Sequence, residues 1–167
     1  MNRKIAVLDT NSKDIFEEYF KNSAEVVLYN SIDEAEGDIL ALDNYFGEIP
    51  ERIFNSTKIL NIHPSLLPAF ANSNALIQAY TSGVKVSGVT VHYVDKNNFY
   101  GRILAQYPLI LDSSMHYNQY VDELTALGNK LYAPVVESVL DDVVFDFSKL
   151  FKNNCSGSCF SCKKCKK

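Results

Sequence analysis

The chain has 167 residues, 47% of them hydrophobic, and a formal net charge of −4. A chain of this size can bury a sizeable core without disulfide bonds, so we expect one domain followed by a short tail. No run approaches the roughly 20 apolar residues that span a bilayer, and an acidic body argues against a nucleic-acid groove. We therefore expect a cytoplasmic protein whose partners are neither membranes nor nucleic acids.

Positive charge gathers at the C-terminus. Residues 152–167 contain five lysines and no acidic residue, so residues 1–151 carry a net charge of −9. The same last segment contains all four cysteines. We expect an α/β domain over residues 1–151 and a Cys/Lys-rich tail over residues 152–167.

Strand and helix patterns alternate along the first part of the chain. Apolar runs predict strands at 4–9, 24–29, 38–42 and 58–62, and helical spacing predicts helices at 12–22 and 50–54, with a shortened one at 31–36. This alternation is typical of a mostly parallel, Rossmann-like sheet with helices on its faces. In such sheets ligands bind beyond the carboxyl ends of the strands.

The second part of the chain predicts a different sheet edge. A helix at 73–82 ends at Gly83, and a long strand follows at 84–94. The next strand, 103–111, contains Pro108, which cannot donate to a ladder and so favours an antiparallel edge position. A terminal helix is expected at 116–142 from its apolar spacing.

The run NIHPSLLPAF, residues 61–70, places an amide and an imidazole two residues apart at the end of a strand. Asn61 and His63 therefore lie on the same face, and Pro64 ends the strand where His63 emerges. Two interpretations remain open at this point: a catalytic pair, or an Asn61 that caps the following turn with His63 packed against it.

NIHPSLLPAF resembles the signature of the folate-dependent formyltransferases, above all the glycinamide ribonucleotide formyltransferases. Residues 83–95, GVKVSGVTVHYVD, are similar to that family's G-V-K-V-S/T-G-x-T-V-H-F/Y-V-D, and residues 101–106, GRILAQ, fall where it has G-P-I-I-x-Q. The resemblance implies a formyltransferase sheet that moves a formyl group from 10-formyltetrahydrofolate to an amine, as in purine biosynthesis. Its partners would be small molecules, a folate and an amine.

The resemblance also implies roles for single residues. Asn61 would donate its amide N–H to the tetrahedral oxyanion, and His63 would act as electrophile and proton carrier. A further set would lie at the folate, although core packing or a structural histidine explains most of these positions equally well: Leu66, Leu67, His92 and Asp95.

Two departures from the family pattern predict altered, reduced or lost activity. Phe99 stands where the family has a catalytic aspartate, and Asp95 could replace that acid only if its loop shifts. The glycine-rich phosphate loop is absent: the turn at residues 9–13 has no glycine, Asp9 opposes a phosphate, and a helix N-cap is the simpler interpretation.

The cysteines have the spacing C-x3-C-x2-C-x2-C, formed by Cys155, Cys159, Cys162 and Cys165. Four thiolates at this spacing can converge on zinc, the first choice, or on an iron–sulfur cluster. A reduced-thiol terminus without metal is the plainer alternative. A competing hypothesis for the whole chain is a non-catalytic binding or regulatory module whose cysteine tail senses metal or redox state.

Overall fold

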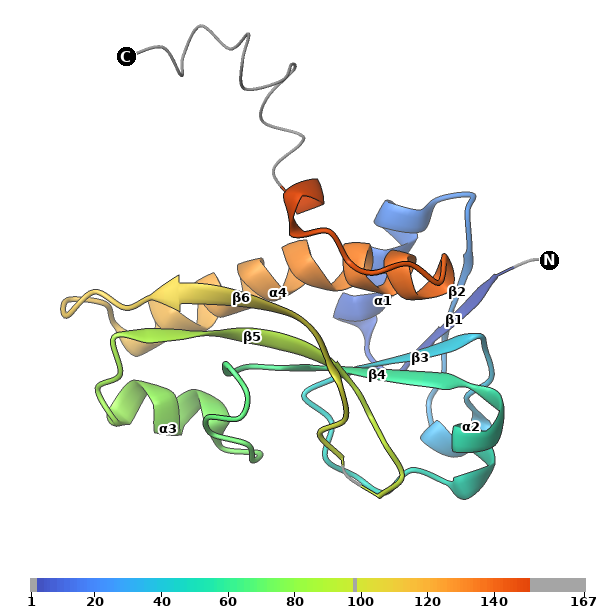
Figure 1. Ribbon diagram of the computed structural model, residues 1–167, viewed down its shortest axis with the longest axis horizontal. Helices are drawn as coiled ribbons and strands as arrows, with labels where there is room; N and C mark the ends of the chain where they lie inside the picture. Colours follow the sequence, from blue (N-terminus) through green and yellow to red (C-terminus); the bar gives the residue numbers. More distant parts are fainter. Residues whose placement is uncertain (1–2, 98, 151–167) are drawn as a thin grey trace, which may run out of the picture.

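The computed structural model describes residues 3–97 and 99–150, which form a six-stranded sheet with helices on both faces (Figure 1). The spatial order is β2-β1-β3-β4-β5-β6. The strands are β1 (Lys4–Val7), β2 (Glu25–Leu28), β3 (Ile39–Asp43), β4 (Lys58–His63), β5 (Val86–Tyr93) and β6 (Ile103–Ile110). The first four are parallel, whereas β5 is antiparallel to β4 and β6 to β5. This confirms the predicted mostly parallel sheet with an antiparallel edge.

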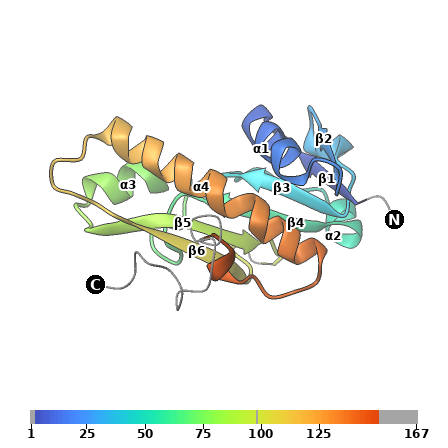
Figure 2. The same ribbon diagram turned by 90° about the horizontal axis from the view of Figure 1, so that it is seen from above.

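Four α-helices cover the sheet. They are α1 (Thr10–Phe20), α2 (Glu51–Ser56), α3 (Ala75–Thr81) and α4 (Tyr117–Leu140), with 3₁₀ turns at Ile32–Glu34 and Phe147–Leu150. Helices α1 and α4 lie on one face, and α2 and α3 on the other (Figures 1 and 2). Within residues 3–97 and 99–150, no helix is long and apolar enough to cross a membrane.

Helix α4 supplies much of the core on its face of the sheet. Tyr120, Leu131 and Val135 are fully buried at the predicted helical spacing. The hydroxyl of Tyr132 lies 2.8 Å from the Leu42 carbonyl oxygen and 3.1 Å from that of Leu60. Because these carbonyls belong to β3 and β4, the tyrosine fixes α4 against these two strands.

Gly88 explains why β5 and β6 approach closely. A Cβ at this position would lie 2.2 Å from the Tyr107 carbonyl oxygen, so only glycine fits. Gly88 is paired with Pro108, and β6 is the outer strand, as the proline predicts.

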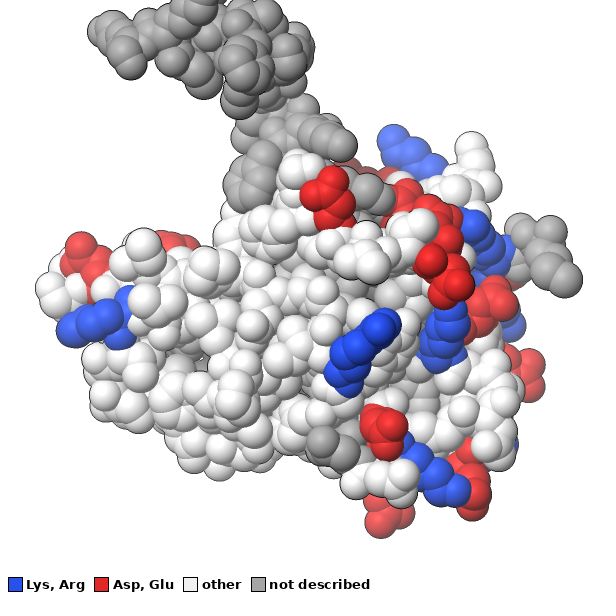
Figure 3. Space-filling model, in the orientation of Figure 1, with Lys and Arg blue, Asp and Glu red and all other residues white. Residues whose placement is uncertain are grey.

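Charge is unevenly spread over the surface in view. Residues 64–84 contain no charged side chain, and the surface over α3 is correspondingly uncharged (Figure 3). The segment that follows β4 therefore brings no charged side chain to the carboxyl ends of the parallel strands.

Candidate functional site

Four polar side chains are buried together at the carboxyl end of β4. In the antiparallel ladder Asn61 is paired with His92, and His63 with Thr90. All four are 0% exposed. Residues directly opposite in an antiparallel pair project to the same side, so these four share one face of the sheet. The expected common face of Asn61 and His63 is therefore present.

The amide of Asn61 is held by the chain that follows β3. Its Oδ1 accepts a hydrogen bond from the Tyr45 N–H at 3.2 Å. Its Nδ2 lies 3.5 Å from the Tyr45 carbonyl oxygen and 3.5 Å from Nε2 of His92. These last two contacts are long for hydrogen bonds, whose usual N···O distance is about 2.9 Å. Asn61 is thus oriented through its oxygen, while its N–H groups are only weakly engaged.

Both ring nitrogens of His92 face other groups. Its Nδ1 lies 2.8 Å from the Tyr93 carbonyl oxygen. Since a carbonyl can only accept, Nδ1 carries the proton, and Nε2 faces Asn61 as an acceptor. Burial lowers the pKa of His92, with the Tyr93 bond opposing that shift. The neutral ring therefore presents an acceptor to the Asn61 amide at the long distance of 3.5 Å.

His63 differs from His92 in having one ring nitrogen available. Its Nε2 donates to the Phe70 carbonyl oxygen at 3.0 Å, so the proton belongs on Nε2. The Nδ1 atom is buried and has no hydrogen-bond partner among the described residues. Burial lowers the pKa of His63, and the bond to Phe70 opposes the shift. The result is a neutral imidazole with an unused lone pair, the form that can accept a proton.

Three aromatic rings, here called the aromatic cover, enclose the two histidines: Phe46, Phe99 and Tyr100. The ring centroids of Phe46 and Tyr100 lie 5.7 and 5.5 Å from that of His63. Phe99 stacks on Phe46 at 5.8 Å and meets His92 edge-on at 6.3 Å. The aromatic cover therefore contributes to the burial of both imidazoles.

The loop after His63 is bound to the sheet through Thr90. Its Oγ1 donates to the Ser65 carbonyl oxygen at 2.6 Å and accepts from the Leu67 N–H at 3.1 Å. Leu67 is 6% exposed, and Leu66 packs over Gly88. Both leucines thus pack the loop of residues 64–70 against the sheet. This packing places the Phe70 carbonyl oxygen against His63. Their contact with a folate stays a prediction.

Asp95 lies at the surface, in the loop between β5 and β6. Its carboxylate accepts from the Asn97 N–H at 2.8 Å, which directs it into its own turn. It lines an open hollow of about 310 Å³ together with Ile49, Phe54 and Phe99. Asp95 therefore lies beside Phe99, in the turn that it caps. Among the described residues, no hydrogen bond or ion pair joins it to His63.

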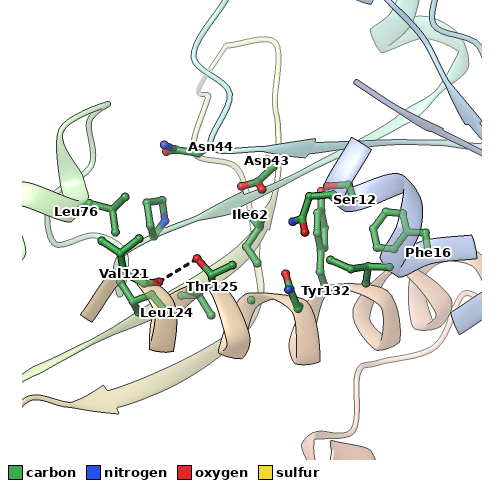
Figure 4. A pocket seen from close by; sticks show the side chains of 16 residues that line it. Ser12, Phe16, Asp43, Asn44, Ile62, Leu76, Val121, Leu124, Thr125 and Tyr132 are labelled. Atoms are coloured by element: carbon green, nitrogen blue, oxygen red, sulfur yellow. Dashed lines mark hydrogen bonds between the residues drawn. The ribbon is translucent and has the colours of Figure 1, made fainter. Parts of the chain in front are cut away.

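The opposite face of the same sheet end carries a cavity of about 130 Å³ that the sequence analysis missed (Figure 4). Asp43, the last residue of β3, lines it. Desolvation, with a smaller contribution from Asp9, raises the pKa of Asp43 to about 6, although the residue as a whole is exposed and solvent screens part of this shift. The available signal was an acid immediately after the buried run at 39–42.

The turn after β1 is a helix cap, as the sequence favoured. Asp9 is the N-cap of α1, and its side chain accepts from the Ser12 N–H at 2.7 Å. A carboxylate of the chain itself therefore occupies this helix N-terminus, a position that favours an anion.

Replacing Asp43 with asparagine is expected to stabilise the fold at pH 7. The raised pKa means that the folded state binds the proton more tightly, so stability falls as pH rises from about 4 to about 6. After allowance for solvent screening, the gain at pH 7 should be about 1 kcal/mol. Urea unfolding of both proteins from pH 4 to 8 measures it. A difference that does not change with pH would contradict this assignment.

No metal-binding group was found in the described part of the chain: residues 3–97 and 99–150 hold no cluster of three or more histidine, cysteine or acidic side chains placed to bind an ion. The predicted ligands Cys155, Cys159, Cys162 and Cys165 lie outside these ranges.

Known proteins resemble most of the chain. Residues 3–136 match the family model described as "Formyl transferase". Phosphoribosylglycinamide formyltransferase of Bacillus subtilis is 38% identical over 107 residues, which are 63% of this chain and 55% of that enzyme. Formyltetrahydrofolate deformylase of Haemophilus influenzae is 30% identical over 129 residues, 76% of this chain and 45% of that enzyme.

Solved structures of known proteins share the fold of this chain. Glycinamide ribonucleotide transformylase 1 from Geobacillus kaustophilus superposes with a TM-score of 0.67 at 24% identity, over 84% of this chain and 100% of that one. The chain spans about half the length of the curated relatives that it matches.

Proposed function

Because the chain belongs to the formyl transferase family, we propose that it transfers a formyl group from 10-formyltetrahydrofolate to a small primary amine in the cytoplasm. The observation that carries the proposal is the buried Nδ1 of His63, which has no hydrogen-bond partner among the described residues and belongs to the same face of β4 as the weakly engaged amide of Asn61. A proton acceptor next to an oxyanion donor is the pair that acyl transfer to an amine requires.

The proposed reaction forms one C–N bond and breaks another. The amine nitrogen attacks the formyl carbon, and the Asn61 N–H stabilises the tetrahedral oxyanion. His63 takes a proton from the attacking nitrogen at Nδ1 and returns it to N10 of the folate as the N10–C bond breaks. The Tyr45 N–H holds the Asn61 amide through its oxygen and leaves the amide N–H groups for this role.

The hollow beside Asp95 is the proposed position of the folate. Its volume of about 310 Å³ is at the lower end of the range of small-molecule sites, about 300–1,000 Å³. Phe99 lines it and also belongs to the aromatic cover, so a ligand there would contact the rings that close over His63. Leu66 and Leu67 support the loop that carries the Phe70 carbonyl.

The acceptor is proposed to differ from glycinamide ribonucleotide. The turn after β1 lacks glycine, and Asp9 caps α1, which removes the usual phosphate cradle. Together with Phe99 in place of the acid, this supports an altered or slower reaction. Hydrolysis, in which water replaces the amine, is a second candidate because it also needs no phosphate cradle, and one relative is a deformylase.

Product analysis separates these activities. The purified chain is incubated with 10-formyltetrahydrofolate, with and without a panel of primary amines, and formylated amine and formate are measured by mass spectrometry. Formylated amine supports transfer, and formate alone supports hydrolysis. If neither forms and calorimetry detects no folate binding, both enzyme proposals fail and the non-catalytic binding module is favoured.

The cysteine tail is a separate proposal, and with it the division into a domain at 1–151 and a tail at 152–167. The spacing of Cys155, Cys159, Cys162 and Cys165 supports one zinc ion, or less favourably an iron–sulfur cluster. Protein purified without oxygen should contain about one equivalent of metal, which Cys159→Ser should lower. Metal analysis that finds neither zinc nor iron in the intact chain would leave only free thiols.

A further inference from the structure

The cavity on the α4 face of the sheet has apolar side walls and polar residues at its sheet side. Ile15, Phe16, Val89 and Leu124 make its sides apolar. Asp43 and Asn44 lie at its sheet side, across from Thr125 and Tyr132 of α4 (Figure 4). The volume of about 130 Å³ is well below the roughly 300 Å³ of a typical drug-sized ligand.

Two polar side chains at the sheet side of the cavity, Asp43 and Asn44, lack a partner among the described residues. The Oδ1 atom of Asn44 is buried and lacks a hydrogen-bond partner among the described residues. No lysine or arginine of residues 3–97 and 99–150 forms an ion pair with Asp43. The sheet side of this cavity therefore offers an unpaired carboxylate and an unpaired amide oxygen, both of which can accept from the N–H donors of a cation.

The local charge also excludes one class of ligand. Asp9 lies close enough to Asp43 to contribute to the raised pKa of that carboxyl. Two carboxylates at the helix N-terminus repel a phosphate and attract an ammonium group. Apolar walls with a carboxylate at the end fit a short apolar amine.

The cavity and the Asn61–His63 pair lie on opposite faces of the sheet, at the same end of β4. Asp43 is the cross-strand partner of Ile62, which lies between Asn61 and His63 in β4. The Asn44 N–H also donates to the Ile62 carbonyl oxygen at 2.9 Å. An amine held by Asp43 is therefore at the same end of β4 as the imidazole of His63.

We propose that this cavity binds the acceptor of the transfer reaction, a small phosphate-free primary amine with an apolar carbon skeleton, through an ion pair of its ammonium group with Asp43. The reaction assumed here is that of the proposed function, whereas the class of ligand is inferred from the residues that line the cavity. Asp43 takes one proton from the ammonium group, which leaves the neutral amine that can attack the formyl carbon. That proton passes to solvent after transfer.

Binding measured without folate tests the site apart from the reaction. Calorimetry with isobutylamine and benzylamine should show saturable binding, at least tenfold tighter than that of isobutanol and benzyl alcohol. Asp43→Asn should weaken amine binding at least tenfold, whereas Asp14→Asn, an exposed acid of α1, should not change it. Phosphoethanolamine should bind less tightly than isobutylamine.

Several results would overturn the site: equal binding of amine and alcohol by the unaltered protein, unchanged amine binding by a folded Asp43→Asn protein, or preference for the phosphate-bearing amine. The comparison of amine with alcohol needs no variant. If amines bind through Asp43 and no formylated product forms with any of them, the site stands and the transfer reaction fails. If a phosphate-bearing amine is formylated equally well by Asp43→Asn, transfer stands and this site fails.

Discussion

Replacing His63 with alanine is expected to lower the rate of formyl transfer by about 10²- to 10⁴-fold, the range typical of a lost general acid–base group. The reason is specific to this ring. Its Nδ1 is buried without a partner among the described residues, whereas both nitrogens of His92 face other groups. Steady-state rates of formylated-amine production measure the effect.

The third histidine of the chain provides a matched control. His116 is exposed and precedes α4, outside both cavities, so His116→Ala should retain the full rate. Because burial lowers the pKa of His63, the unaltered protein should keep its rate on acidification to the ordinary histidine pKa of about 6.5 and lose it only below that. Equal rates for the His63→Ala and unaltered proteins would remove His63 from the mechanism.

The fold and the common strand face of Asn61 and His63 could be predicted because both follow from local sequence patterns. The alternation of strands and helices determines the parallel sheet, and a spacing of two determines a common strand face. Pro108 alone was enough to place β6 at an edge. Each of these inferences needs only neighbours in sequence and the geometry of a strand.

The surroundings of the pair could not be predicted in the same way. The Asn61 amide is clamped by the backbone of Tyr45, and His63 is covered by Phe46, which come from a loop 16 and 17 positions earlier. Asp43 was missed because an acid after a buried strand is usually a solvated turn residue. Only the packing of α4 against β3 and β4 makes it the end of a cavity.

Replacing Phe99 with aspartate is expected to raise formyl transfer about tenfold, because it restores a negative charge beside the two histidines. Phe99 meets His92 at 6.3 Å between ring centroids and shares Phe46 and Tyr100 with His63 as neighbours. A carboxylate at roughly 4–6 Å favours the charged form of an imidazole, so His63 would hold the transferred proton more readily. The rate of formylated-amine production, with the same amine for every variant, measures the gain.

The control for this substitution is Phe99→Asn, which has nearly the same shape as the aspartate variant without its charge. Either change removes a half-buried ring that stacks on Phe46 and opens the aromatic cover, with a cost in stability of about 2 kcal/mol. The ratio of the Phe99→Asp rate to the Phe99→Asn rate therefore separates the effect of the negative charge from the effect of opening the aromatic cover. If asparagine raises the rate as much as aspartate, the cover limits access to His63, and a missing acid does not explain the altered site. If neither raises it, Phe99 is not the group that separates this chain from its relatives.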